Sequence, residues 1–337
     1  MEKRARTVFF EIEPAEKAYL SKFFRKGESI YVKEKLSAEN AGDFSDAVVI
    51  STFVGSKIDK KILQKMPRLK LIATRSTGYD HIPIAECKKR GIAVSNVPSY
   101  GEYTVAEHTF GLILTLSRNI HKAYYRMKFS ENFSYKGLEG FDLRGRTLGV
   151  IGAGHIGLHV IKIGRGFGMN VLVTDKNQSS LLAEVLNFRY VELEELLQNS
   201  DVISLHIPYM TQTHHLINRS NLNLIKKGAI LVNTARGGVV ETEAIIEGLD
   251  RGIFSGVGLD VLEGEQLIRE EKEVLSEEHS QDELKLILSN HILMNRENVV
   301  ITPHNAFNSR EAVQRILETT KDNIEAFFAG DTVNRIV

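Results

Sequence analysis

The sequence predicts an α/β protein with two parallel-sheet domains, and three observations lead to this prediction. The 337 residues exceed the usual length of one domain. Short apolar runs of strand type alternate with charged segments of helix type along most of the chain. One apolar run, residues 147–151, leads directly into glycines at 152, 154 and 157, as at the first turn of a doubly wound sheet.

The first part of the chain predicts one α/β unit that ends at Pro98. Four short β-rich runs alternate with charged segments, and they lie at residues 7–12, 46–53, 70–75 and 92–96. From Thr104 to about Met127 the apolar residues have helical spacing, which predicts one long helix that crosses between the domains.

The second part predicts a larger doubly wound sheet. Its strands are expected at residues 147–151, 170–174, 202–207, 229–233 and 256–261. Residues 264–298 are charged and are expected to be irregular, and a strand at 299–302 and a helix from Ser309 to Phe328 follow. If that last helix packs on the first unit, the first domain is discontinuous.

The glycine turn predicts a dinucleotide site. Gly152 allows the sharp turn, Gly154 lets the backbone approach a pyrophosphate, and Gly157 lets the next helix pack closely. Asp175 ends the next strand, 18 residues beyond Gly157, where an acid binds a ribose 2′-hydroxyl and repels a 2′-phosphate. The expected cofactor is therefore NAD rather than NADP. Methyltransferases and flavoproteins share the glycine spacing, and Asp175 has the alternative of being a loop or cap residue.

Composition points to a small-molecule partner. Lysine plus arginine and aspartate plus glutamate both total 43, so no net charge attracts nucleic acid or a membrane surface. Cys87 is the only cysteine, which excludes an internal disulfide and a cysteine-based zinc site and fits a reducing compartment. The apolar run at Val8–Phe10 is too short for a signal peptide or membrane helix, so a cytoplasmic protein is expected.

Polar residues after the predicted strands mark the expected site, because open α/β sheets bind ligands at the carboxyl ends of their strands. A turn at Thr77 and Gly78 can direct backbone amides at a carboxylate, and Tyr100 at the domain junction can line a cleft. Further along the chain, the residues at strand ends are Pro208 with Thr213, Arg236, Asp260 with Glu265, and His304.

Arg236, Glu265 and His304 supply the chemistry that hydride transfer to a 2-oxo acid requires. Arg236 presents a charged planar fork to a carboxylate and carbonyl. A histidine such as His304 can carry a proton near neutral pH, and Glu265 is its expected carboxylate partner. Their alternative roles are a surface ion pair for Arg236, a helix cap for His304 and a solvated charge for Glu265. Three other histidines are interpreted as loop residues rather than metal ligands: His206, His214 and His215.

At these residues the chain resembles the D-isomer-specific 2-hydroxyacid dehydrogenases over nearly its whole length. The motifs are Gly152–Gly157, His206–Pro208, Asn233–Gly238, Gly258–Val261 and Thr302–Ala306, in family order. The resemblance implies a Rossmann NAD domain at 100–299 inserted into a flavodoxin-like substrate domain at 1–99 and 300–337. It also implies a homodimer formed through the NAD domains and the arm after the long helix.

The resemblance further implies roles for individual residues. Arg236, Glu265 and His304 become the catalytic triad, and the backbone of Thr77 and Gly78 holds the substrate carboxylate with Tyr100 nearby. Besides the glycines, the implied NAD contacts are His155, Ile156, Asp175, Ile207, Pro208, Thr213, Thr234, Ala235, Arg236 and Asp260.

Within the family, several segments look most like D-lactate dehydrogenases. They include Arg75–Asp80, Pro98–Tyr100 and Gly140–Leu143, together with the long insert between Glu265 and His304. The resemblance therefore favours reduction of pyruvate to D-lactate. The alternatives are an enzyme for glyoxylate, hydroxypyruvate or a bulkier 2-oxo acid, and a nicotinamide-sensing protein like the corepressors that resemble this family.

Overall fold

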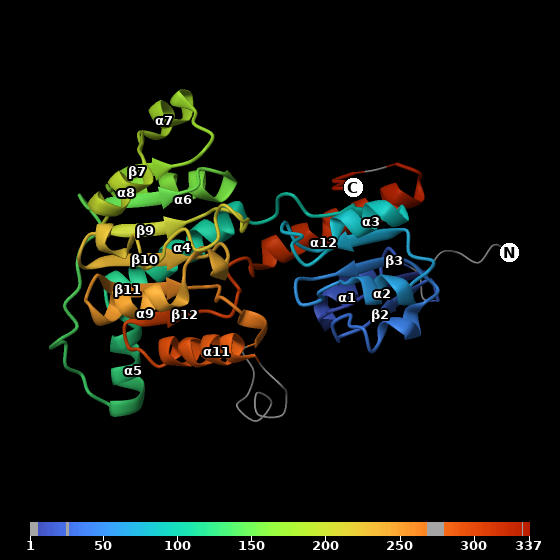
Figure 1. Cartoon of the computed structure of the whole chain (residues 1–337), viewed down its shortest axis with the longest axis horizontal. Coiled ribbons are helices and arrows are strands. Elements are labelled where there is room, and N and C mark those ends of the chain that lie inside the picture. Colours follow the sequence, from blue (N-terminus) through green and yellow to red (C-terminus); the bar gives the residue numbers. More distant parts are fainter. Residues whose placement is uncertain (1–5, 25–26, 268–279, 332) are drawn as a thin grey trace. The chain divides into compact units, whose positions relative to one another are not determined.

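The computed structural model describes residues 6–24, 27–267, 280–331 and 333–337, and it divides the chain into two compact units. The first unit consists of Met1–Tyr100 and Ser309–Val337, and the second of Gly101–Asn308 (Figure 1). The first unit is therefore discontinuous in sequence. Among the described residues, none of the helices combines the length and apolar character needed to cross a bilayer.

The first unit contains a five-stranded parallel sheet. Its strands are β1 (Arg6–Phe9), β2 (Ser29–Tyr31), β3 (Ala47–Thr52), β4 (Leu71–Thr74) and β5 (Ala93–Ser95), in the spatial order β2-β1-β3-β4-β5. This is the flavodoxin-like strand order, as predicted. Four of the strands match the predicted runs. β2 was not predicted, because three half-buried residues are too few to show a periodic pattern.

Helices cover both faces of this sheet. α1 (Pro14–Leu20) and α12 (Arg310–Phe328) contribute to one apolar core, and α2 (Lys60–Lys65) and α3 (Ile84–Arg90) to the other. A short 3-10 turn lies at Ala41–Phe44. The Ser309 hydroxyl accepts a hydrogen bond from the Ala312 amide and so caps α12. The last helix of the chain thus completes the first unit.

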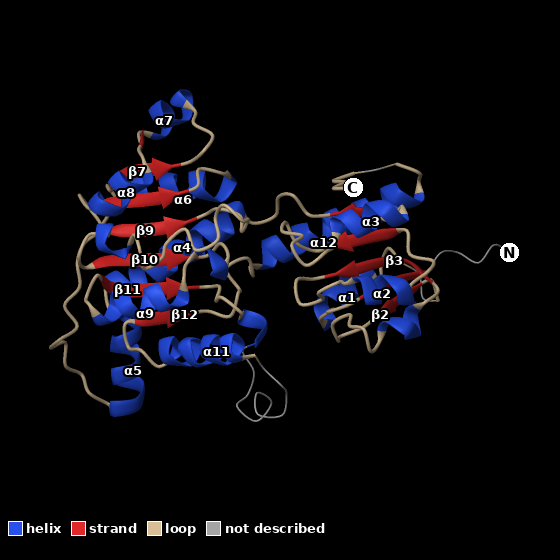
Figure 2. Ribbon diagram, in the orientation of Figure 1, coloured by secondary structure: helices blue, strands red, loops and turns tan. Residues whose placement is uncertain are grey.

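The second unit contains a seven-stranded sheet whose strands point in one direction (Figure 2). Its order is β12-β11-β10-β9-β6-β7-β8, the Rossmann arrangement with one added edge strand. The strands are β6 (Thr147–Ile151), β7 (Asn170–Thr174), β8 (Arg189–Tyr190), β9 (Val202–Leu205), β10 (Ala229–Asn233), β11 (Phe254–Leu259) and β12 (Val299–Ile301). The chain reverses its strand order between β6 and β9, which is where ligands bind in such sheets.

Two apolar cores lie on opposite faces of the seven-stranded sheet. α4 (Glu102–Ser117) and α6 (His155–Gly166) build one core, and α8 (Leu193–Asn199), α9 (Thr242–Asp250) and α11 (Gln281–Met294) build the other. α5 (Ile120–Ser130) has no buried residue, and α7 (Ser180–Leu186) packs beside α6. Short 3-10 turns lie at Leu222–Leu224, Gly237–Val239 and Glu265–Leu267.

The predicted long helix between the units is wrong, because α4 and α5 are separate helices. Asn119 has a φ of 51°, a left-handed conformation that ends the first helix and that asparagine tolerates better than most residues. Its side-chain amide donates to the carbonyl of Glu139, which fixes the break.

Two other predicted boundaries differ from the structure. Residues 281–294 of the segment expected to be irregular form α11, which Ser280 and Glu283 begin with a reciprocal capping box. Residues 268–279 of that segment lie outside the described residues. The predicted return to the first domain at residue 300 falls inside β12, which pairs with β11 in the second unit.

Candidate active site

The glycine turn between β6 and α6 has the geometry of a phosphate site. Gly152 has a φ of +99°, and a Cβ there would lie 2.5 Å from the carbonyl oxygen of His206. A Cβ on Gly157 would lie 1.9 Å from the carbonyl oxygen of Gly152, so close packing requires glycine at both positions. At Gly154 an added Cβ would meet nothing within 4 Å. Space thus remains where a pyrophosphate approaches the amino-terminal end of α6.

Asp175 follows β7 and lies against this turn. One carboxylate oxygen accepts a hydrogen bond from the Ala153 amide at 2.6 Å, and the other accepts from the Asn177 amide at 2.7 Å. Because the side chain remains partly exposed, its oxygens keep further lone pairs for a ribose hydroxyl. The residues present therefore fit a bound dinucleotide.

The segment after β9 packs beside the same turn. The Ile207 side chain, like the His206 carbonyl, lies in the space a Cβ on Gly152 would need. Burial lowers the pKa of His206 to about 3, so its ring is neutral and shares a hydrogen bond with Ser204. The Thr213 hydroxyl donates to the Pro208 carbonyl and accepts from the Met210 amide. The predicted NAD contacts Ile207, Pro208 and Thr213 thus belong to one fixed loop.

Arg236 is held where β10 ends. The buried Asn233 side chain accepts from the Ala235 amide and donates to the Arg236 carbonyl, which sets the backbone around the arginine. Thr234 shares a hydrogen bond with Thr109 on α4. Arg236 is half-buried, and its guanidinium donates to the Ala235 carbonyl at 2.8 Å.

Asp260 anchors the loop that carries His304. Its carboxylate is buried and accepts hydrogen bonds from the Thr302 hydroxyl and from the amides of Asn305 and Ala306. The Asp260 carbonyl accepts from the His304 amide at 2.9 Å. These bonds hold His304 at a φ of 50°, a conformation that a non-glycine residue adopts at a cost in energy. The predicted NAD contact Asp260 thus also has a positioning role, which its place in the sequence did not show.

His304 and Glu265 form a hydrogen-bonded pair. His304 Nδ1 and Glu265 Oε1 are 2.8 Å apart, which leaves Nε2 of the imidazole without a hydrogen bond within the described residues. Burial alone would raise the pKa of Glu265. The pKa is nevertheless lowered, by the hydrogen bond to His304 and the charge of His304, by the hydrogen bond from the Leu262 amide, and by the charge of Arg236. Glu265 is therefore ionised at neutral pH and orients the histidine. The structure brings Arg236, Glu265 and His304 together in the second unit.

The predicted carboxylate loop lies in the first unit. The Thr77 hydroxyl donates to the Val97 carbonyl, and the Asn96 side chain donates to the Thr77 carbonyl, each at 2.8 Å. Thr77 is exposed and Gly78 is half-buried, so the backbone of this turn is accessible. The Tyr100 carbonyl accepts a hydrogen bond from Arg315 on α12.

Arg75 is a residue whose role the sequence analysis missed. Its side chain is only 1% exposed and donates to the carbonyls of Phe10 and Glu11 and to the Ser51 hydroxyl. A buried guanidinium bonded to the ends of β1 and β3 stabilises the start of the Thr77–Gly78 turn. The signal in the sequence is a single arginine directly after an apolar strand.

Comparisons with known proteins find similar sequences and a similar structure. The family model D-isomer specific 2-hydroxyacid dehydrogenase, NAD binding domain, matches residues 110–306. A 2-hydroxyacid dehydrogenase homolog of Haemophilus influenzae is 39% identical, over 86% of this chain and 85% of the relative. A glyoxylate reductase of Thermococcus litoralis is 36% identical, over 87% and 83%.

A solved structure is similar over nearly the whole chain. It is D-lactate dehydrogenase from Aquifex aeolicus complexed with NAD and lactic acid, with a TM-score of 0.86 and 39% identity. The match covers 97% of this chain and 96% of that one. The similarity therefore extends over both units.

Proposed function

We propose that this chain, which belongs to the D-isomer specific 2-hydroxyacid dehydrogenase family and is an NAD-dependent oxidoreductase, reduces pyruvate to D-lactate. The observation that carries the proposal is the hydrogen-bonded His304–Glu265 pair beside Arg236, in the unit that holds the glycine turn. It provides a proton donor and an anion-binding cation for a 2-oxo acid.

Arg236 binds and polarises the substrate in this proposal. Its planar guanidinium matches a carboxylate and the adjacent carbonyl oxygen better than a lysine would. The accessible backbone of Thr77 and Gly78 remains a predicted second contact for the carboxylate, and Tyr100 a predicted contact of the substrate side chain. When bound, NADH supplies the hydride that adds to C2 of pyruvate.

His304 supplies the proton. Its Nδ1 is bonded to Glu265, so Nε2 is the atom that donates to the substrate oxygen. The ionised Glu265 stabilises the protonated imidazole before transfer and fixes the ring afterwards. In the reverse direction the neutral ring accepts the proton from the hydroxyl of lactate. One proton and one hydride thus convert the ketone to the alcohol.

Asp175 accounts for the preference for NAD over NADP. We expect Asp175→Ala to lower the ratio of kcat/KM with NADH to that with NADPH by about 10–100-fold. The variant loses the hydrogen bond between the carboxylate and the ribose 2′-hydroxyl of NADH, and it no longer repels the 2′-phosphate of NADPH. Steady-state kinetics with both cofactors measures the ratio. Asp175→Asn, which keeps an acceptor for the Ala153 amide, separates the effect of charge from loosening of the turn. An unchanged ratio in both variants would show that another residue selects the cofactor.

We further propose that the chain forms a homodimer through α5 and the segment after it. This region exposes large apolar side chains, with Phe133 at 91% and Tyr135 at 86% exposed. The other exposed apolar side chains of this region are those of Ile120, Tyr124, Tyr125, Met127 and Phe129. So large an apolar surface on a chain with no net charge favours a second copy as its partner.

The double variant Phe133→Ser and Tyr135→Ser tests the dimer. We expect light scattering to give the mass of two chains for the wild type and of one chain for this variant at micromolar concentration. Leu181→Ser, on α7, removes an exposed side chain outside the region and should leave the dimer intact. A wild-type protein that remains a monomer at high concentration would refute the proposal.

A second 2-oxo acid is the main alternative substrate. Among the alternatives, the similarity to a glyoxylate reductase supports glyoxylate. The resemblance to the family adds hydroxypyruvate and 2-oxoisocaproate as further candidates. Comparing kcat/KM for these acids and pyruvate, from NADH absorbance, distinguishes them. The highest value with pyruvate supports the proposal, and a tenfold higher value with another acid replaces the assigned substrate.

The cysteine content supports a cytoplasmic location in this proposal. The single Cys87 is buried, and burial raises the pKa of its thiol to about 11, so it stays protonated at neutral pH. A chain with no internal disulfide suits a reducing compartment.

A further inference from the structure

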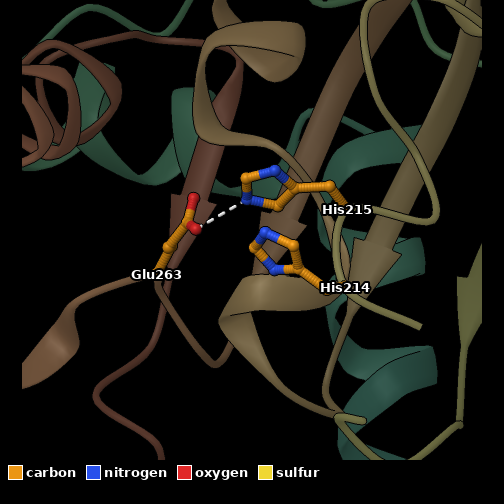
Figure 3. A group of neighbouring side chains, drawn as sticks. All are labelled: His214, His215 and Glu263. Atoms are coloured by element: carbon orange, nitrogen blue, oxygen red, sulfur yellow. Dashed lines mark hydrogen bonds and ion pairs between the residues drawn. The ribbon is translucent and has the colours of Figure 1, made fainter. Parts of the chain in front are cut away.

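His214, His215 and Glu263 form a cluster outside the residues proposed for substrate and cofactor (Figure 3). The two histidines lie in the loop after β9, and Glu263 follows β11. Each residue offers one ligand atom, and the three atoms lie within 4.8 Å of one another. Two imidazole nitrogens and one carboxylate oxygen thus meet from two separate segments of the second unit.

The three side chains lie against one another. His215 Nε2 and Glu263 Oε1 are 2.7 Å apart, and the two imidazole rings are stacked with centroids 3.8 Å apart. Figure 3 shows His215 bonded to Glu263 through one ring nitrogen, with the His214 ring lying against the His215 ring. The cluster does not include His206, which is bonded to Ser204 within β9.

A second layer of hydrogen bonds orients the cluster. The Tyr209 hydroxyl shares a hydrogen bond with His214 Nδ1 at 3.2 Å, and the Thr242 hydroxyl donates to Glu263 Oε2 at 2.9 Å. The Asn290 side chain donates to the backbone carbonyl of Glu263. His214 Nε2 and Glu263 Oε1 are thereby left as the inward-facing atoms. Such outer partners fix the tautomer of metal-binding histidines and the orientation of metal-binding carboxylates.

We propose that His214, His215 and Glu263 bind a divalent transition-metal ion, with Zn²⁺ as the best match. Two histidines and one glutamate form a donor set that zinc accepts with a fourth position left to water. Mg²⁺ and Ca²⁺ prefer oxygen ligands alone, so they fit this set poorly. The sequence alone favours loop residues without a metal role for these histidines, because Glu263 lies 48 residues after His215.

The cluster needs only small movements to bind zinc. Bonds of about 2.0–2.1 Å in a tetrahedral site place ligand atoms about 3.3 Å apart. His215 and Glu263 are already within that separation. His214 is exposed, so its ring can turn out of the stack on His215 to close the remaining gap.

Zinc binding to protein without a histidine tag tests this proposal directly. After treatment with a chelator, the wild type is titrated with Zn²⁺ in competition with a chromogenic chelator. We expect one zinc ion per chain and an affinity that millimolar Mg²⁺ does not reduce. His214→Ala, at an exposed position, should fold normally and weaken binding by at least about 10–100-fold, and Tyr209→Phe by about tenfold.

A matched histidine outside the cluster serves as the control. His159→Ala, on α6, should bind zinc as the wild type does. X-ray absorption of the zinc complex should show two histidine nitrogens at about 2.0 Å. No zinc bound to the wild type, or equal affinities in His214→Ala and the control, would overturn the proposal. Because binding is measured without substrate, its failure is independent of the proposed enzymatic function.

Discussion

Replacement of His304 by glutamine should lower kcat for pyruvate reduction by about 10²–10⁴-fold, the usual contribution of a general acid. Glutamine can keep a hydrogen bond to Glu265, but it has no proton to transfer at neutral pH. NADH binding should stay the same, because the histidine side chain is bonded to Glu265 and not to the glycine turn. Steady-state kinetics together with fluorescence titration of NADH measures both quantities.

The same substitution at a histidine outside the site serves as the control for His304→Gln. His291→Gln changes a half-buried histidine on α11 and should leave kcat within about twofold of the wild type, as expected for a site away from the chemistry. If His304→Gln keeps the wild-type kcat, the proton comes from another group and the proposed mechanism fails.

Arg236→Lys should lower kcat/KM for pyruvate by about 10²–10³-fold, comparable with the loss of one donor to a developing oxyanion. Lysine keeps the charge but loses the planar fork that binds a carboxylate and a carbonyl oxygen together. The KM for pyruvate should rise and kcat should fall, since Arg236 is proposed both to bind and to polarise the substrate. Initial rates over a wide range of pyruvate concentration separate the two effects.

A surface arginine provides the comparison for Arg236→Lys. Arg251 pairs with Glu247 one helical turn away, and Arg251→Lys should leave both kinetic constants near those of the wild type. Equal constants for Arg236→Lys and Arg251→Lys would mean that the guanidinium of Arg236 does not touch the substrate.

The sheet architecture was predictable because buried parallel strands are almost continuously apolar. β6 and β10 are bounded by polar or glycine residues and lie within the predicted runs. β2 and β8 contain three and two residues, too few to be recognised by composition. The break at Asn119 escaped prediction because helical spacing continues across it, and only the backbone conformation of one residue separates α4 from α5.

The residues of the candidate site were predictable where a chemically suitable side chain comes soon after the end of a strand. Arg236, Asp260 and His304 each follow a strand, and the β-α pattern alone places them at one edge of the sheet. The three bonds to the Asp260 carboxylate and the pairing of His215 with Glu263 were not predictable, because they join loops that are far apart in sequence. Such contacts depend on how the loops close over the sheet, which leaves no periodic signal in the sequence.

The configuration of the product tests the proposed function most directly. The purified protein is incubated with pyruvate and NADH, and the lactate formed is resolved by chiral chromatography. We expect D-lactate in an amount equal to the NADH consumed. L-lactate, or no lactate despite measurable binding of NADH, would refute the proposed function.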